Sequence, residues 1–259
     1  MSGDIYIAAA GALACEKRLQ IISNNLANAN TVGFKMDRGH MKQIDPADLP
    51  SQSAQNPEDL AASRAHLFWN NFSMYTDHSN GALKQTDNDF DLALVGKGFF
   101  CVQTPDGVHY TRKGDFTLDS EGVLVTGNGW PVLGEGGEIT INGTENPHKY
   151  AKFAVDEQGN VAVDGRQVGR LRIVDFADTS LLSKAGDTLF APPAAGVPAT
   201  TAEKVKVSQG FIELSNVDSV KMMTEMIEVL RGYESYQKVI QSADETYSQA
   251  INQVGSLNG

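Results

Sequence analysis

Several features are scarce in this sequence, and each absence excludes a class of protein. The 259-residue chain has two cysteines, Cys15 and Cys101, too few for a disulfide-stapled scaffold or a cysteine-rich zinc site. No run of apolar residues approaches the roughly 20 that a membrane-spanning helix needs. Acidic residues outnumber basic ones by 32 to 21, and the net charge of −11 argues against binding the phosphate backbone of a nucleic acid.

The sequence also lacks the pattern of a cleaved secretory signal, which needs a basic region followed by a continuous apolar region. Asp4 comes directly after Ser2-Gly3, and the apolar run that begins at Ile5 leads into Glu16-Lys17-Arg18. We therefore expect that no signal peptide is cleaved from this chain.

Motifs that carry chemistry are absent as well. The five histidines are scattered, without metal-ligand spacing, and no Gly-x-Ser-x-Gly elbow is present. We expect no enzyme, no catalytic residue, no cofactor, no metal ion and no small-molecule substrate. The enzymatic alternative is a periplasmic β-fold glycosidase using Asp115, Asp119 and Glu121 as its carboxylates. Carboxylates in hairpin turns, however, usually cap backbone groups.

The first 34 residues carry the pattern of a long helix. Alanines favour helix formation there, and the helix is expected to stop in the asparagine-rich stretch Asn24–Asn30. Apolar residues recur at alternating steps of three and four, which is the a/d spacing of a coiled-coil seam: Ile5, Ala8, Ala12, Cys15, Leu19, Ile22 and Leu26.

The C-terminal part of the chain repeats this pattern over a longer helix. Ser219 is the expected N-cap and Gly255 the expected stop. The seam residues again alternate between steps of four and three: Met222, Met226, Val229, Tyr233, Tyr236, Ile240, Ala243, Tyr247, Ala250 and Val254.

The middle of the chain has the pattern of an all-β domain, in which short apolar runs alternate with turn signals. Turns such as Ser120-Glu121-Gly122 and Asp164-Gly165 supply residues that tolerate positive φ. The expected strands are Asp91–Val95, Phe99–Gln103, Val108–Thr111, Val123–Thr126, Ile139–Asn142, Lys152–Val155, Val161–Val163 and Arg170–Phe176.

These patterns predict an α+β fold in which long coiled-coil-type helices at both ends flank a central all-β domain. We divide the chain into an N-terminal helix at 1–34, an irregular connector at 35–84, a β-rich domain at 85–210 and a C-terminal helix at 211–259. Within the connector, Leu67-Phe68-Trp69 and Phe72 are too apolar for a free loop, so we expect residues 36–75 to dock on a neighbouring subunit.

The two seams leave two arrangements open. Two such helices can pack on each other within one chain, or lengthwise on helices of other subunits. A seam only two residues wide is narrower than the apolar face of an ordinary core helix, which favours packing on other helices along their length.

Three local stretches resemble one family of proteins. Near the N-terminus, Asn24-Asn25-Leu26-Ala27-Asn28-Ala29-Asn30-Thr31-Val32-Gly33-Phe34-Lys35 is similar to the N-terminal signature of bacterial flagellar rod and hook proteins. The stretches Tyr110–Phe116 and Trp130–Gly134 resemble the β-domain signature of that family. The third is Gln209–Asp218, with Ser215, Asn216 and Val217, which resembles its C-terminal signature.

The resemblance implies a structural subunit of the flagellar basal-body rod, exported through the flagellar type III apparatus and located in the periplasm. The terminal helices would form the inner layer of a helical tube, packed on other rod proteins or on copies of the same chain. The stretch Thr76–Thr86 is similar to proximal-rod members of the family, and the distal-rod members are the alternative. Copy number, helical stagger and the identity of the neighbours stay open.

Overall fold

The computed structural model describes residues 2–41, 72–141, 152–193, 199–202 and 205–256, in two compact units. The helical unit combines Met1–Ala27, Asp37–Thr76 and Asp218–Gly259, and the β unit combines Asn28–Met36 with Asp77–Val217. The N-terminal helix, the β-rich centre and the C-terminal helix follow in the expected order, which confirms the α+β prediction.

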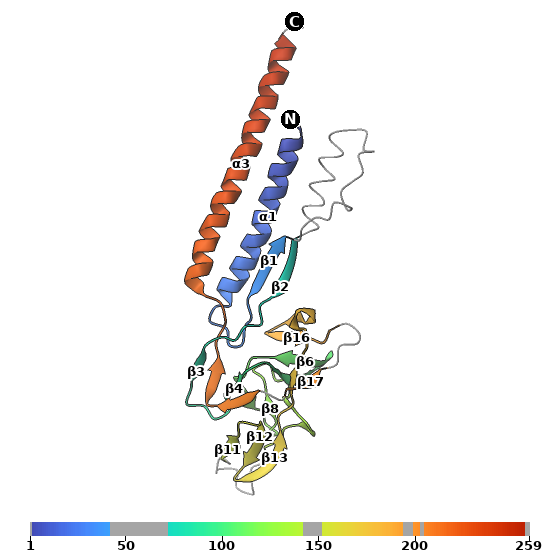
Figure 1. Ribbon diagram of the computed structural model, residues 1–259, viewed down its shortest axis with the longest axis vertical. Coiled ribbons are helices and arrows are strands. Elements are labelled where there is room, and N and C mark those ends of the chain that lie inside the picture. Colours follow the sequence, from blue (N-terminus) through green and yellow to red (C-terminus); the bar gives the residue numbers. More distant parts are fainter. Residues whose placement is uncertain (1, 42–71, 142–151, 194–198, 203–204, 257–259) are drawn as a thin grey trace. The chain divides into compact units, whose positions relative to one another are not determined.

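The helical unit is built on two long helices, α1 (Ser2–Ala27) and α3 (Ser219–Ser256), which lie side by side and antiparallel (Figure 1). Arg18 Nη2 of α1 lies 3.1 Å from Glu225 Oε1 of α3. Further along, the Tyr236 ring of α3 packs directly over Gly11 of α1. The glycine leaves the room that this aromatic ring occupies.

The two helices differ in length, and α3 continues beyond the end of α1. At about 1.5 Å per residue, the 26 residues of α1 span about 39 Å and the 38 residues of α3 about 57 Å. Because Gly11 lies opposite Tyr236, the antiparallel register brings Ser2 level with about residue 245 of α3. The last turns of α3 therefore have no residue of α1 beside them.

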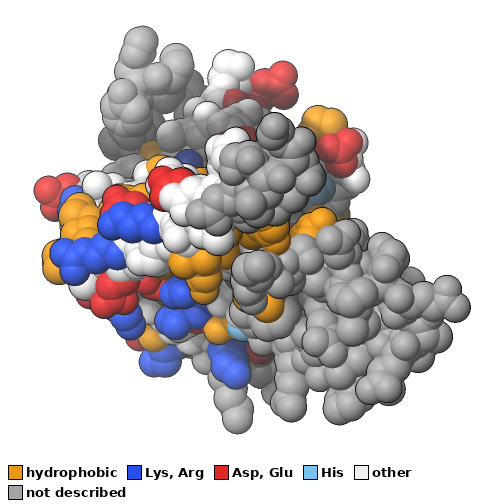
Figure 2. Space-filling model, turned by 90° about the horizontal axis from the view of Figure 1, so that it is seen from above, with side chains coloured by type: hydrophobic (Ala, Val, Ile, Leu, Met, Phe, Trp, Pro, Cys, Tyr) orange, Lys and Arg blue, Asp and Glu red, His pale blue; other side chains and the backbone are white. Residues whose placement is uncertain are grey.

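Part of the apolar surface of the helices is exposed. Val220, Met223, Ile227 and Leu230 of α3 and Tyr6, Ile7 and Leu13 of α1 are more than 40% exposed. Figure 2 shows hydrophobic side chains at the surface next to Lys, Arg, Asp and Glu side chains. An isolated exposed apolar residue is ordinary, but these are grouped.

Side-chain hydrogen bonds stabilise the C-terminal end of α1 and the N-terminal end of α3. α1 ends at Ala27, within the predicted asparagine-rich stretch, and Asn25 exchanges two 2.8 Å hydrogen bonds with the backbone of Asp37. At the start of α3 the prediction of Ser219 as N-cap is wrong. The Asp218 carboxylate caps this helix, since its Oδ1 accepts hydrogen bonds from the amides of Val220 and Lys221.

The connector expected to be irregular at 35–84 contains three strands where the structure describes it, separated by stretches without regular secondary structure such as 77–82. Strands β1 (Asp37–Met41) and β2 (Phe72–Thr76) pair antiparallel, and β3 (Leu83–Gln85) lies further along. The β1 sequence has little apolar alternation, so periodicity does not reveal it. Its pairing is instead supported by polar contacts, such as Thr76 Oγ1 to Asp37 Oδ1 at 2.8 Å. Leu67, Phe68 and Trp69 lie outside the described residues, and nothing is described of the Phe72 side chain.

The β unit contains a six-stranded sheet in the order β15-β16-β6-β5-β14-β17 and a three-stranded sheet β11-β12-β13; two-stranded pairs join β18 to β4, β19 to β3, β9 to β10 and β7 to β8. All named pairs are antiparallel. A 3₁₀ turn, η2, spans Thr179–Leu181. The strands, beyond β3, are β4 (Leu92–Val95), β5 (Phe99–Thr104), β6 (Gly107–Thr111), β7 (Thr117–Leu118), β8 (Leu124–Val125), β9 (Leu133–Gly134), β10 (Gly137–Glu138), β11 (Phe153–Val155), β12 (Asn160–Val163), β13 (Arg166–Arg170), β14 (Ile173–Asp175), β15 (Ser183–Gly186), β16 (Leu189–Ala191), β17 (Thr200–Thr201), β18 (Lys206–Gln209) and β19 (Phe211–Glu213).

Most predicted strands coincide with observed ones, but the strand expected at Ile139–Asn142 is wrong. Thr140 forms only an isolated bridge with Val123, and the ladder strand β10 ends at Glu138. Ile139 and Ile141 are nevertheless buried in the core, which explains their apolar character without a strand.

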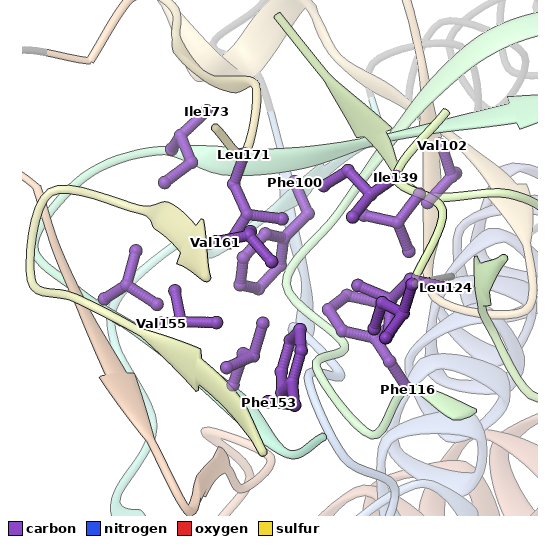
Figure 3. Packing of buried hydrophobic residues seen from close by; sticks show 14 of the residues in the cluster. Phe100, Val102, Phe116, Leu124, Ile139, Phe153, Val155, Val161, Leu171 and Ile173 are labelled. Carbon is purple, nitrogen blue, oxygen red and sulfur yellow. The ribbon is translucent and has the colours of Figure 1, made fainter. Parts of the chain in front are cut away.

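The core of the β unit draws on strands from distant parts of the sequence. Phe100 and Phe116 meet edge to face with ring centroids 5.2 Å apart, and Phe153 packs against Phe90. In Figure 3, Val155, Val161 and Leu171 lie on the side of Phe153, while Leu124 and Ile139 lie near Phe116. No helix among the described residues is both long enough and apolar enough to cross a membrane.

Two glycines on facing helices provide a matched test of the α1–α3 contact. A methyl group at Gly232 would meet Cys15 Sγ at an ordinary 3.6 Å, so Gly232→Ala should stabilise the chain by up to about 1 kcal/mol through helix propensity. At Gly11 the new methyl would lie 2.4 to 2.9 Å from three Tyr236 ring carbons, so Gly11→Ala should displace the ring and lose that gain. Thermal unfolding followed by circular dichroism compares them. An equal rise in Tm for both variants would contradict the contact.

Candidate functional site: a buried ion cluster and the helical seams

The predicted seam residues occupy the more buried sides of the two helices. On α1, Ala8 and Ile22 are buried and Ile5, Ala12, Cys15, Leu19 and Leu26 are half-buried. On α3, Met222 and Val229 are buried, Met226, Tyr233, Ile240, Ala243 and Tyr247 are half-buried, and Tyr236 is 36% exposed. Ala250 and Val254 lie within α3, but nothing is described of their side chains.

Residues of the N-terminal and C-terminal family signatures make specific hydrogen bonds in the structure. Asn216 Oδ1 accepts a hydrogen bond from the Met36 amide at 2.8 Å, and its Nδ2 donates to the Asp77 carbonyl at 2.8 Å. Gly33 donates its amide to the Glu213 carbonyl at 2.7 Å. Ser215 Oγ accepts from the Val217 amide. The N- and C-terminal signatures are thus bonded to each other inside the β unit.

The remaining signature positions lie around this junction. Thr31 Oγ1 donates to Asn28 Oδ1, which closes the turn after α1. Phe34 is buried, with the Lys184 ammonium 4.2 Å from the centre of its ring. Leu26, Ala29 and Val217 are half-buried, while Asn24, Ala27 and Asn30 are exposed.

At the centre of the junction lies a buried ion cluster formed by Lys35, Gly81, Arg112 and Glu213. Lys35 Nζ is 2.5 Å from Glu213 Oε1, and Arg112 Nη1 is 3.2 Å from Glu213 Oε2. The Gly81 amide donates to Glu213 Oε1 at 2.8 Å. The three charged side chains are 3% exposed or less. Each of the three signatures contributes one charge to this Glu213 cluster.

Burial dominates the electrostatics of the cluster. It lowers the pKa of Lys35 and of Arg112, because a charged group is poorly solvated there, and the Glu213 carboxylate opposes both shifts. Backbone oxygens accept further hydrogen bonds from the cations, although the buried Arg112 Nε has no partner among the described residues. Lys35 Nζ donates to the Ser79 carbonyl at 2.6 Å, and Arg112 Nη2 donates to the Gly96 carbonyl at 2.7 Å.

Two glycines allow the backbone to approach the cluster. A Cβ at Gly81 would lie 1.9 Å from the Leu214 carbonyl oxygen. Gly33 has φ +69, and a Cβ there would lie 2.4 Å from the Lys113 amide nitrogen. A side chain at either position would push the neighbouring backbone segment away, at Leu214 for Gly81 and at Lys113 for Gly33. Both glycines are therefore sterically required.

A histidine lies against the cations of the cluster. The His78 ring packs 4.9 Å from Phe190 and 5.5 Å from Phe99, and neither of its nitrogens has a hydrogen-bond partner among the described residues. Burial, reinforced by the positive charges of Lys35, Arg112 and Lys184, lowers the pKa of His78 to about 4. The ring is therefore neutral at pH 7.

The carboxylates considered for glycoside hydrolysis serve local roles in the structure. Asp119 Oδ1 accepts hydrogen bonds from the amides of Glu121 and Val123, which caps a hairpin turn. Asp115 lies 3.5 Å from Lys113 Nζ, and burial raises the pKa of its carboxyl. Within the described part of the chain, no three His, Cys, Asp or Glu side chains form a group suited to a metal ion.

The Glu213 cluster was not predicted from the sequence, although the sequence contains an indication of it. Glu213 is the only charge in the apolar run Phe211-Ile212-Glu213-Leu214, and Lys35 follows the buried Phe34. A single charge within an apolar stretch that a strand buries needs a partner. The pattern does not say which partner, because Lys35, Arg112 and Glu213 are brought together only by the fold.

Removing the charge of Glu213 should leave two buried cations facing each other. We expect Glu213→Gln to lower the free energy of unfolding by about 3–5 kcal/mol, the cost of breaking a buried ion pair. Glu157, whose pair with Lys206 is 64% to 65% exposed, is the control, and Glu157→Gln should cost less than about 1 kcal/mol. Denaturant titration measures both. Equal losses for the two variants would contradict the assigned role of Glu213.

The neutral His78 predicts a pH dependence of stability. In the unfolded chain histidine binds a proton near pH 6.5, whereas folded His78 binds it only near pH 4. Stability should therefore fall as the pH drops from 6.5 to 4, by about 2 kcal/mol after allowance for screening at the exposed edge of the ring. His78→Phe should remove this component, while replacing the exposed His40 by Phe should not. Identical pH profiles for wild type and His78→Phe would refute the assignment.

Three regions of the chain, which include the three stretches that resemble flagellar rod and hook proteins, each match a known family model. Residues 5–35 match the family model described as flagella basal body rod protein. Residues 93–163 match the flagellar hook protein FlgE/F/G D1 domain, and residues 208–253 match the C-terminal region of the flagellar basal body rod FlgEFG proteins. Lys35, Arg112 and Glu213 fall one in each matched region.

Individual relatives extend over the entire chain. The flagellar basal-body rod protein FlgF of Caulobacter vibrioides is 33% identical over 259 residues, covering 100% of both chains. FlgG of Bacillus subtilis is 34% identical over 97% of this chain and 99% of its own, and FlgF of Mesorhizobium japonicum is 30% identical over 99% of each. The chain therefore belongs to the FlgF/FlgG family of structural proteins of the bacterial flagellar basal-body rod.

Proposed function

We propose that this chain polymerises through its terminal helices, in coiled-coil-type packing, into the part of the flagellar rod that crosses the periplasm. The observation that carries the proposal is the overhang of α3. Its seam continues through Tyr247, Ala250 and Val254, although α1 begins at Ser2, near the level of residue 245. An apolar seam that extends beyond the reach of α1 calls for a helix of another subunit.

In this proposal the helices form the inner layer of a tube and the β unit lies outside them. The partners are other rod proteins, and copies of the same chain where they are adjacent. The chain reaches the periplasm through the flagellar type III export apparatus without cleavage of a signal peptide. No nucleic acid, cofactor or small-molecule substrate takes part, and the protein has no enzymatic role.

The position along the rod is proposed as proximal, as in the FlgF branch. The alternative is a distal-rod subunit, and the relative that favours it is FlgG of Bacillus subtilis, whose identity of 34% is close to that of the FlgF relative. A glycosidase is disfavoured because Asp119 is engaged in capping a turn.

We also propose that the folding unit of the β domain is wider than residues 85–210. That range cuts off two of the three residues of β3 and omits all of β19 with Glu213, so it would leave Arg112 buried without its carboxylate. The segments Asn28–Met36 and Asp77–Val217 together contain every member of the Glu213 cluster. The apolar part of the connector at 36–75 remains the proposed docking segment for a neighbouring subunit.

A charge in the overhanging seam tests the assembly without disturbing the α1–α3 pair. Ala250→Glu should leave the unfolding temperature of the monomer unchanged, because no residue of α1 lies beside it. The carboxylate would be buried between subunits at a cost of several kcal/mol, so the chain should fail to enter rods and the cells should lose motility. Immunoblots of purified basal bodies and swimming assays measure both effects.

The control is Gln249→Glu, which adds the same charge one residue earlier on an exposed position of α3. Cells with this variant should swim like the parent. If Ala250→Glu cells assemble normal rods, the seam does not mediate assembly at this position.

A further inference from the structure

Two Asn-Gly pairs lie among the described residues, Asn80-Gly81 and Asn128-Gly129. Asparagine is thermolabile, and it deamidates most readily before glycine, because glycine places no side chain beside the reacting atoms. Both asparagine side chains are exposed to solvent. The two pairs differ in how the structure holds the glycine amide that takes part in the reaction.

Deamidation begins when the amide nitrogen of the glycine attacks Cγ, the side-chain carbonyl carbon of the asparagine. The new N–Cγ bond replaces the bond from Cγ to the side-chain nitrogen, which leaves as ammonia with the proton of the glycine amide. Water then opens the succinimide ring. Opening at Cγ gives aspartate, and opening at the main-chain carbonyl carbon gives isoaspartate, in which the chain runs through Cβ and Cγ. The reaction therefore needs an amide that can lose its proton and rotate toward Cγ.

The Glu213 cluster opposes both requirements at Gly81. The Gly81 amide donates to the buried Glu213 Oε1 at 2.8 Å, and a carboxylate beside the nitrogen disfavours the negative charge that loss of the proton would create. Rotation is opposed by Leu214. Its carbonyl oxygen occupies the space that a Cβ of Gly81 would need, and its amide donates to the Ala82 carbonyl at 2.9 Å.

The backbone on the other side of Asn80 is fixed as well. The Ser79 carbonyl accepts hydrogen bonds from Lys35 Nζ at 2.6 Å and from Asn216 Nδ2 at 3.2 Å. An exposed asparagine side chain thus stands on a backbone that buried groups hold on both sides. The geometry for cyclisation at Asn80 becomes accessible only when these contacts open together.

At Asn128 the corresponding amide is held by a local contact. Gly129 donates its amide to the Thr126 carbonyl at 2.8 Å across an exposed turn, and a Cβ at Gly129 would meet no atom within 4 Å. This hydrogen bond can open without separating any buried charges. Asn128 therefore serves as an internal reference, because the same dipeptide stands in the same chain outside the cluster.

We infer that Asn80 is a modification site that the Glu213 cluster keeps closed: it deamidates when the junction opens, and isoaspartate at this position prevents the junction from closing again. Isoaspartate adds one carbon to the backbone between residues 80 and 81, a displacement of about 1.5 Å. That shift exceeds the range of the 2.8 Å hydrogen bond from Gly81 to Glu213. Time spent unfolded is thereby converted into a permanent loss of the folded β unit.

Mass-spectrometric peptide mapping of the full chain in water labelled with heavy oxygen measures both conversions, with fragment ions assigning each residue. In guanidinium chloride at mildly alkaline pH, Asn80 and Asn128 should convert at similar rates. In the folded chain Asn80 should convert at least about a hundredfold more slowly than in the unfolded chain, whereas Asn128 should be slowed less. Equal slowing of the two residues would overturn the inference.

A variant of the cluster shows whether the protection comes from Glu213. Glu213→Gln should raise the Asn80 rate in the folded chain by about tenfold or more and leave the Asn128 rate unchanged, and the control Glu157→Gln should alter neither. Should Glu213→Gln fail to fold, wild type in guanidinium chloride below its unfolding transition replaces it. The Asn80 rate should then rise with denaturant while the Asn128 rate stays level. An Asn80 rate that responds to neither change would contradict the role of the cluster.

Refolding tests the consequence of the modification. Chains kept unfolded for increasing times are diluted into native buffer, and near-ultraviolet circular dichroism reports the return of packed aromatic rings. Wild type should lose recovery in step with isoaspartate at residue 80. Asn80→Gln should lose less, because the longer glutamine side chain cyclises far more slowly. Equal losses for the two chains would show that the modification does not block closure of the junction.

Discussion

The constraint on which the β unit depends is the burial of the Glu213 carboxylate. Removing a carboxylate from water costs several kcal/mol unless charges and hydrogen bonds replace the water. Lys35, Arg112 and the Gly81 amide provide them, and these groups come from three separate regions of the sequence. The cluster holds two cations and one carboxylate, so losing Glu213 would leave both buried cations without a counter-ion, whereas losing one cation would leave a single ion pair. The cluster therefore ties the segment that follows α1 to the segment that precedes α3.

The helices serve two purposes with different surfaces. The seam contact within the chain covers Ala8, Ile22, Met222 and Val229, which makes α1 and α3 one packed pair. In the proposed function, the overhang of α3 and the outer surfaces remain for neighbouring subunits. A heptad pattern alone does not distinguish these purposes, because packing within a chain and packing between chains select the same residue types. The difference in length between the helices is what separates them.

Much of the fold could be predicted from the sequence, and the failures have physical reasons. Helices α1 and α3 are long and strongly periodic, and strands such as β5 are apolar runs bounded by turns. Strands β1 and β2 were missed because polar contacts such as Asp37 to Thr76 support them. Asp218 was missed as the cap because Ser219, beside it, is an equally suitable residue type. The motifs identified the family, but the meeting of Lys35, Arg112 and Glu213 depends on chain segments far apart in sequence.

The most direct test of this account is native-state hydrogen exchange on the full chain, read at three amides. Gly33 donates to the Glu213 carbonyl, Gly81 to the Glu213 carboxylate, and Leu92 to the Gly114 carbonyl in the β unit. If the Glu213 cluster holds the unit together, the three amides should exchange through one opening with the same free energy. Glu213→Gln should lower that free energy equally at all three. Loss of protection at Gly33 and Gly81 with Leu92 unchanged would show that the cluster is only a local contact.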